Sequence, residues 1–365
     1  MSGAPAPSHS ALPDGARAAR RRAWRWIRYA VGLGLAALAV WALAGRRGEL
    51  SGASGYLGHL DWTWLVLAVA AELGSLAAFA IVQQRLLAAG DVDSSLPQML
   101  SVTFAITAIA NSMPAGPLVS SVFAFHQYRR RGADEAIAGW VLAAVFVAAS
   151  VTLALVAAAG VGIAGAEGSG LNLVWVTIGV LVAALAMGVV FVQQRALTWT
   201  IRALLRGTRR VLHWPSGDLG AHVDRIVSRL AAVSLSARAI AAIAWWGVAN
   251  WILDCGCLAL SFLAVGVGVP WKGLLLAYGA GQLAANLPIT PGGLGVVEGS
   301  LTIALVAFGG AETSTVAAVL LYRIITFWGE LPVGWGTWGA LAWMARRHPV
   351  PATRQFEADV AEVVA

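Results

Sequence analysis

Two long apolar stretches of this chain are each interrupted near the middle by the same kinds of residues. The first interruption contains Asn111 and reads ANSMPAGPLVSS, and the second contains Asn286 and reads AANLPITPGGLGVVEGS. Inside a bilayer, backbone that is not helical is tolerated only where protein surrounds it or where it lines a cavity. Matching interruptions in the two halves of a membrane protein therefore point to a binding site between the halves.

Composition supports a membrane protein. The chain is 59% hydrophobic and 12% charged, with a mean hydropathy of +0.74, so it has too few polar side chains to cover a soluble globule. A helix needs roughly 20 apolar residues to cross the hydrocarbon core. Six segments meet or approach this length, namely 27–44, 62–82, 136–160, 171–192, 239–265 and 315–344. The sequence thus predicts an all-α polytopic protein with six spanning helices.

The distribution of basic residues predicts the topology. We expect each interrupted stretch, 98–128 and 273–309, to form a re-entrant hairpin that enters and leaves by one face. The cytoplasmic side then holds 21 of the 25 basic residues, the outer side holds three, and Arg323 lies inside the membrane. Threading each stretch as a single span would instead put 13 outside and 11 inside, against the positive-inside rule. We expect a plasma-membrane protein whose two termini lie in the cytoplasm. The hairpin threading also makes the two halves, about 62–160 and about 239–344, an inverted repeat.

The remaining segments are polar or basic. We expect residues 1–24 to form a disordered basic tail, 25–345 to form the transmembrane domain, and 346–365 to form a C-terminal tail. In the cytoplasmic loop 193–238, arginines at 195, 202, 206 and 209 alternate with apolar residues, as in a helix lying on anionic lipid. A plain solvated loop is the alternative. The net charge of +7 is accordingly interpreted as attraction to the membrane surface, and no nucleic-acid binding is expected.

The second interrupted stretch also carries a family signature. Its residues are Asn286, Pro288, Pro291, Gly292, Gly293, Gly295 and Glu298, followed by Leu321, Tyr322, Arg323 and Pro332. This pattern resembles the transmembrane flippase-like domain of lysylphosphatidylglycerol synthases, over about residues 25–345. The resemblance implies a lipid-handling membrane domain, and the best-known members move aminoacylated phospholipid between leaflets. Because the sequence ends at residue 365, we expect a stand-alone member without the soluble aminoacyl-transfer domain.

Five ionisable residues fall inside apolar segments, where a charge costs several kcal/mol and normally has a buried partner. They are Glu72, Asp254, Glu298, Arg323 and Glu330. Arg323 and Glu330 are seven residues apart, which is too far for a direct i,i+4 pair. We therefore expect Arg323 to meet Asp254 or Glu298, and its planar fork would also suit a phosphate. A structural Arg–carboxylate clasp that only locks helices together is the alternative.

The glycines of the second stretch allow two interpretations. Backbone N–H groups of Gly292, Gly293 and Gly295, ahead of a helix that opens at about Val296, could bind a lipid phosphate. Alternatively, glycine is needed there only for tight turning and close packing. Glu298 would repel an anion unless it is protonated or paired with Arg323, which favours a proton-linked or amine-bearing headgroup. The first stretch has no charge at its tip, and we expect it to be the structural counterpart.

Taken together, the sequence predicts a transporter of a phospholipid, an aminoacylated one included, or of a lipid-linked headgroup. The predicted substrate-binding residues are Glu72, Asn111, Asp254, Asn286, Pro288, Pro291, Gly292, Gly293, Gly295, Glu298, Arg323 and Glu330. The expected partners are membrane lipid, anionic lipid at the cytoplasmic face and a partner transferase. Neither enzyme activity nor a metal or other cofactor is expected, and Cys255 and Cys257 are assigned to packing. The alternatives are a non-transporting scaffold for a lipid-modifying enzyme and an intramembrane transferase acting on polyprenyl-linked sugar.

Overall fold

The computed structural model describes residues 60–113, 116–165, 171–192, 229, 233, 235–285 and 290–347. The predicted first span 27–44, the tail 1–24 and nearly all of the loop 193–238 and of the tail 346–365 lie outside these residues. Within them the secondary structure is helical, with no strand. The all-α prediction is therefore confirmed for the described part of the chain.

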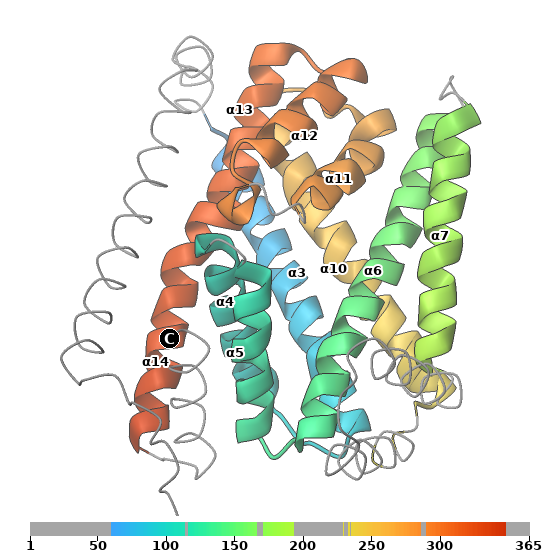
Figure 1. The fold of residues 1–365 in the computed structure, drawn as a ribbon. Helices are drawn as coiled ribbons and strands as arrows, with labels where there is room; N and C mark the ends of the chain where they lie inside the picture. The colour runs from blue at the N-terminus through green and yellow to red at the C-terminus, as the bar shows by residue number, and fades with distance from the viewer. Residues whose placement is uncertain are drawn as a thin grey trace, which may run out of the picture. The chain divides into compact units, whose positions relative to one another are not determined.

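Figure 1 shows the described helices. They are α3 (Trp62–Ala89), α4 (Leu96–Ser112), α5 (Gly116–Arg130), α6 (Glu135–Gly165), α7 (Leu171–Val192), α10 (Ala237–Ala264), α11 (Trp271–Ala285), the 3-10 turn η1 (Pro291–Gly293), α12 (Val296–Ala307), α13 (Glu312–Arg323), the π-helical segment η2 (Ile324–Gly329) and α14 (Glu330–Arg347).

Four described helices are long and apolar enough to cross a membrane. They are Trp62–Ala89, Glu135–Ala164, Ala237–Ala264 and Glu312–Ala345, and they match four of the six predicted spans. Each interrupted stretch forms two short helices that pack against each other, α4 with α5 and α11 with α12. Helix α4 ends one residue after Asn111, at Ser112, and α5 begins at Gly116, while α11 ends at Ala285 and α12 begins at Val296.

The first long helix of each half has the same length. Helices α3 and α10 each contain 28 residues. At their crossing the Ser75 hydroxyl donates to the Asn250 side chain at 3.2 Å, and these residues are 175 apart, the offset between the two helix starts. The backbone N–H of Asp61, before α3, donates to Ala264, the last residue of α10, at 2.9 Å. The paired helices therefore run in opposite directions, as an inverted repeat requires.

The hairpin of each half packs on the last long helix of the other half. Helix α14 packs on α4, and helix α6 packs on α11. Glycine permits both contacts: a Cβ at Gly334 would collide with the backbone oxygen of Phe104, and one at Gly160 would lie 2.7 Å from the backbone nitrogen of Leu276. The Trp335 indole also donates to the Ser112 hydroxyl at 3.1 Å. The halves are thereby interlocked.

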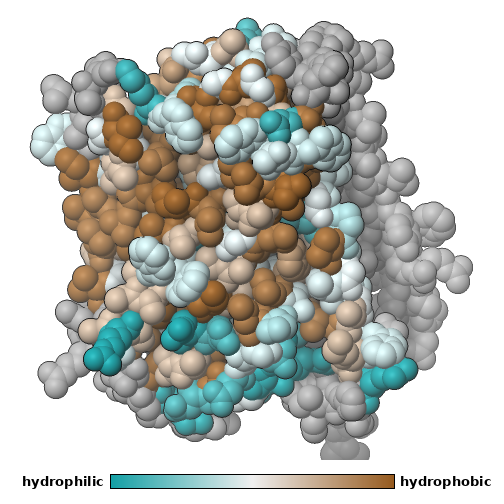
Figure 2. Space-filling view, turned by 180° about the vertical axis from the view of Figure 1, so that it is seen from behind, coloured by the Kyte–Doolittle hydropathy of each residue, from teal (hydrophilic) through white to brown (hydrophobic). Residues whose placement is uncertain are grey.

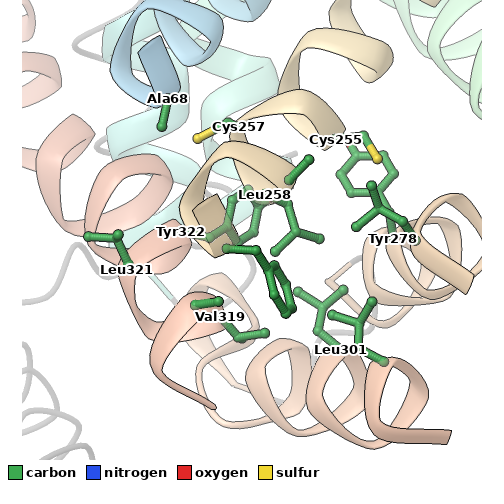
Figure 3. Close-up of a cluster of buried hydrophobic side chains, with 14 of the residues drawn as sticks. Ala68, Cys255, Cys257, Leu258, Tyr278, Leu301, Val319, Leu321 and Tyr322 are labelled. Carbon is green, nitrogen blue, oxygen red and sulfur yellow. The ribbon is translucent and has the colours of Figure 1, made fainter. Parts of the chain in front are cut away.

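Two buried cores form, one around each hairpin. The core at the second hairpin includes Cys257, Leu258, Tyr278, Leu301 and Tyr322 (Figure 3). The core at the first hairpin includes residues from the end of α3, the first half of α4, the end of α5, the start of α6 and Ile243 near the start of α10. Cys255 and Cys257 are free thiols buried in the core at the second hairpin, in agreement with a packing role.

The surface of the described helices is apolar over large areas. Trp62, Leu118, Trp245 and Ile303 expose between 70% and 74% of their surface, which a water-soluble protein would avoid in such number. In Figure 2, hydrophobic residues form a broad band, and hydrophilic residues gather mainly toward one end. A surface of this kind is solvated by lipid, so the chain is a multi-pass membrane protein.

Basic residues segregate to one end of the described helices. Arg85 lies near the end of α3, Arg129 and Arg130 end α5, Arg238 starts α10 and Arg347 ends α14. These helix ends meet because they share the core around the first hairpin. Lys272 starts α11 at the opposite end. The described residues thus reproduce the charge asymmetry that the inverted threading predicts.

Candidate functional site

The tips of the two hairpins meet inside the protein. Helix α4 packs on the turn η1, and the backbone oxygen of Asn111 lies 3.1 Å from the position that a Cβ would take on Gly292. Asn111 therefore takes part through its backbone at the junction of the halves. Asn286 and Pro288 lie outside the described residues, and Pro291 begins η1.

Glycine is required at the second tip by backbone conformation. Gly292, Gly293 and Gly295 have φ angles of 58°, 68° and 81°, a region that side-chain-bearing residues rarely adopt. The Phe327 ring also fills the space beside Gly292 that a Cβ would need. The turn is thus specified by its sequence and closed over by η2.

Arg323 joins this tip to α12. Its Nε donates to Glu298 Oε1 at 2.7 Å, and its Nη2 donates to the backbone oxygen of Gly292 at 2.9 Å. The guanidinium lies over the Phe327 ring, 4.6 Å from the ring centre. The two side chains of the ion pair are only 11% and 16% exposed. Of the two partners expected for Arg323, Glu298 is the one that it contacts as an ion pair.

Glu298 also occupies the predicted anion nest. Its Oε2 accepts the backbone N–H of Gly295 at 2.6 Å, at the start of α12. The N–H of Gly293 donates to the backbone oxygen of Thr290 at 3.1 Å. The nest is therefore filled by the protein's own carboxylate, which a helix N-terminus favours. A lipid phosphate would have to displace Glu298 to use these groups.

Asp254 is the acceptor of a second polar group of side chains. The hydroxyls of Tyr278 and Tyr322 donate to its two oxygens at 2.7 and 2.8 Å, and Gln282 donates at 3.1 Å. These donors come from α11 and α13, so Asp254 ties α10 to both. Sequence reasoning did not identify the two tyrosines or Gln282 as site residues. Tyr322 precedes Arg323 in the family signature, which was the available signal.

Glu72 and Glu330 are the remaining two of the five ionisable residues that the sequence places inside apolar segments. Both are buried, with 5% and 6% of their surface exposed. Glu72 of α3 interacts with both Asp254 of α10 and Glu330 of α14. Arg323 acts electrostatically on Asp254 and Glu330 although its direct ion pair is with Glu298. The structure thus brings all five ionisable residues of the sequence prediction into one connected region.

The described residues contain no group of His, Cys, Asp and Glu suited to a metal ion. A separate pocket of about 410 Å³ lies between α3, α6, α7 and α10, with Val151, Leu185 and Ile240 in its lining. The described residues that line it include no charged side chain, so it suits a hydrocarbon chain and not a headgroup. It contains none of the predicted site residues.

Comparison with known proteins agrees with the family signature. Residues 25–334 match the family described as the lysylphosphatidylglycerol synthase TM region. Two relatives from Methanothermobacter thermautotrophicus, each described as a UPF0104 membrane protein, are 37% identical over 84 residues and 32% identical over 85 residues. Each match covers 23% of this chain and 24% or 25% of the relative. The matched segment therefore spans about a quarter of the length of these relatives.

Proposed function

Because the chain belongs to the family of the lysylphosphatidylglycerol synthase TM region, we propose that it is a transporter that moves a lipid between the two leaflets. The substrate is a phospholipid or a lipid-linked headgroup, and an aminoacylated phospholipid is the specific candidate. The protein acts without catalysing a covalent reaction. It works in the plasma membrane with both termini in the cytoplasm.

One observation carries this proposal: the Glu298–Arg323 ion pair at the junction of the two hairpin tips. Inverted repeats whose broken helices meet at such a junction are the architecture of secondary transporters. Ionisable residues inside a membrane are costly and mark substrate pathways. The apolar pocket beside α7 supports the proposal by offering space for an acyl chain.

The ion pair provides a route to headgroup recognition. A phosphate accepts two parallel hydrogen bonds from a guanidinium, so it can replace Glu298 as the partner of Arg323. Glu298 would then be left without its cation, and the ammonium of an aminoacylated headgroup could supply one. The Glu298–Arg323 pair would thus be replaced by two pairs, phosphate with Arg323 and ammonium with Glu298. This exchange requires a substrate that carries both a phosphate and an amine, which favours an amine-bearing phospholipid over a simple anionic one.

The predicted topology can be tested by cysteine labelling. Both native cysteines are buried, so background labelling by an impermeant thiol reagent should be low. In intact cells, Arg130→Cys should be protected and Glu312→Cys should react, because the inverted threading puts them on opposite faces. Lysed cells provide the control in which both should react. Labelling of position 130 from outside would reject the inverted threading.

Lipid movement itself is tested in proteoliposomes of phosphatidylglycerol and phosphatidylethanolamine that contain the purified protein. A trace of acyl-chain-labelled lysylphosphatidylglycerol or phosphatidylglycerol reports its leaflet by accessibility to an impermeant quencher. The wild-type protein should accelerate movement of the lysylated probe well above protein-free vesicles. The double variant Glu298→Gln with Arg323→Gln should fold, since neither member of the pair is left charged without the other, but it should lose this acceleration.

The result separates the competing functions. A double variant that moves lipid as fast as wild type would reduce the ion pair to a structural clasp. Wild-type protein that moves neither probe would remove the transporter proposal and favour a scaffold for a lipid-modifying enzyme. Chemical conversion of a polyprenyl-linked sugar in the same vesicles would favour a transferase.

A further inference from the structure

Three carboxyl groups from three different helices meet in the interior beside the ion pair. They belong to Glu72 of α3, Asp254 of α10 and Glu330 of α14. Glu72 is the central member, because its side chain has hydrogen-bond contact with each of the other two, whereas Asp254 acts on Glu330 only electrostatically. The cluster links the first half of the chain to the second, and its members come from helices of membrane length.

The charged and titratable groups around this cluster include one cation. Those groups are Cys255 and Cys257 of α10, Tyr278 of α11, and Tyr322 and Arg323 of α13. Helix α4 and segment η2 have no ionisable side chain, and α6 has only Glu135 at its first residue. Arg323 is already bonded to Glu298 and Gly292. Among the described residues, Asp254 accepts hydrogen bonds only from neutral donors, and none of the three carboxyl groups forms an ion pair with Arg323.

A separate observation points to a proton bound by this cluster. Oxygen Oε2 of Glu72 is buried, and no N–H or O–H group of the described residues donates to it. A buried oxygen of this kind costs free energy unless it is satisfied. Its nearest functional neighbours are carboxyl groups, which can accept but cannot donate unless one carries a proton. A shared proton satisfies the orphan oxygen and removes one of the buried like charges.

We propose that the Glu72–Asp254–Glu330 cluster is a proton-binding site that couples lipid movement to the proton gradient through Arg323. This inference rests on the transporter function proposed above. When the cluster holds its proton, Arg323 stays bonded to Glu298 and closes the hairpin tip. When the proton leaves, the added negative charge draws Arg323 away from Glu298 and from the Gly292 backbone oxygen. The released tip can then admit or discharge a headgroup.

The chain contains a segment that can carry this movement. The π-helical segment η2 separates Arg323 from Glu330, so the two residues are joined by one irregular turn. π-helical turns occur inside α-helices frequently at functional sites. Conversion of η2 to regular α-helix would rotate Arg323 relative to Glu330, and Phe327, which stacks on Arg323, lies in that turn. A change of charge at Glu330 is thereby transmitted to the tip.

Proton binding is tested first without any lipid assay. Purified protein in nanodiscs is titrated with pH while infrared difference spectra follow the C=O band of protonated carboxyl groups. Wild type should lose a carboxyl band as pH rises, and Glu72→Gln should lack that band. Glu312→Gln, which alters an exposed residue at the start of α13, should retain it. If Glu72→Gln fails to fold, Glu330→Gln provides the same comparison.

Two infrared results would overturn the site. One is a titrating band that is unchanged in Glu72→Gln and in Glu330→Gln. The other is a band that responds to added sodium at constant pH, which would show that the cluster binds a metal cation instead of a proton. Either result is independent of transport.

Coupling is tested in the proteoliposomes described above, with a pH difference imposed across the membrane. If one proton moves with each lipid, a difference of one pH unit should shift the leaflet ratio of the lysylated probe about tenfold. Glu72→Gln should show no such shift, and Glu312→Gln should behave as wild type. If the protein moves lipid but the leaflet ratio does not depend on the pH difference, the proposed proton coupling is wrong and the transporter function still holds. Absence of any movement would end both transport proposals, and the infrared titration would still decide the proton site.

Discussion

Replacing Arg323 with alanine is expected to lower the free energy of unfolding by about 3–5 kcal/mol and to abolish lipid movement. Glu298 would remain largely buried, with its carboxylate held only by the Gly295 N–H. The backbone oxygen of Gly292 would lose its donor, and the Phe327 ring would lose the guanidinium stacked on it. Each loss falls at the point where the two hairpin tips meet.

Lysine at position 323 should separate stability from transport. Its ammonium can neutralise Glu298, so Arg323→Lys should recover most of the stability. It cannot reach Glu298 and Gly292 in the same planar arrangement, nor bind a phosphate through two parallel hydrogen bonds. We therefore expect a thermal midpoint in detergent close to wild type, together with a strongly reduced rate of movement of the lysylated probe.

The matched control is Arg347→Ala, which removes an exposed arginine that stacks on Trp343 at the end of α14. Its loss should cost about 0.5–1 kcal/mol or less. Equal transport by Arg323→Lys and wild type would show that position 323 supplies only charge. A stable and inactive Arg323→Lys protein is the result that assigns the fork of hydrogen bonds to the headgroup.

Much of the fold follows from apolar length and from the two interruptions. Four long helices lie where uninterrupted apolar residues predict them, and each interruption separates two short helices. The pairing of Arg323 with a carboxylate was predictable, because a lone buried charge inside a membrane is too costly to leave unpaired. The choice of Glu298 over Asp254 was not, since both carboxylates lie in apolar segments and sequence spacing does not fix distances between helices.

The exchange of hairpins between halves could not be inferred from apolar patterning. An apolar face must be covered, but the pattern does not say by which helix. The contact of α14 with α4 depends on Gly334, and the contact of α6 with α11 depends on Gly160. Glycine is frequent in this chain, so no single one stood out. Tyr278 and Gln282 were missed for a related reason: neutral side chains become recognisable as donors only once Asp254 is placed beside them.

Replacing Asp254 with alanine should be nearly as damaging to stability as removal of Arg323. Asp254 accepts hydrogen bonds from Tyr278, Tyr322 and Gln282, whose donors come from α11 and α13. Leaving a buried donor unsatisfied costs about 1–3 kcal/mol. With three donors affected, we expect a loss of at least about 3 kcal/mol in the free energy of unfolding. The change should appear as a large fall in thermal midpoint in detergent.

Single tyrosine changes provide the comparison. Tyr278→Phe and Tyr322→Phe each remove one donor and keep the ring in place, so each should cost only about 1–1.5 kcal/mol. Asp93→Ala changes an exposed aspartate before α4 and should stay within about 0.5 kcal/mol of wild type. An Asp254→Ala protein as stable as the Asp93→Ala control would show that the hydrogen-bonded group does not hold α10 to α11 and α13.

The same variants distinguish a structural role of Asp254 from a role in proton binding. Asp254→Asn keeps one of the two acceptor oxygens, so one tyrosine loses its acceptor and the variant should cost about 1–1.5 kcal/mol, less than Asp254→Ala. If Asp254 only anchors helices, this variant should leave the response to a pH gradient unchanged. If Asp254 also shares the proton of Glu72, Asp254→Asn should remain folded and lose the gradient response. The second outcome is expected, because Glu72 interacts with the Asp254 carboxyl as well as with Glu330. A folded Asp254→Asn protein with an unaltered gradient response would restrict the proton to Glu72 and Glu330.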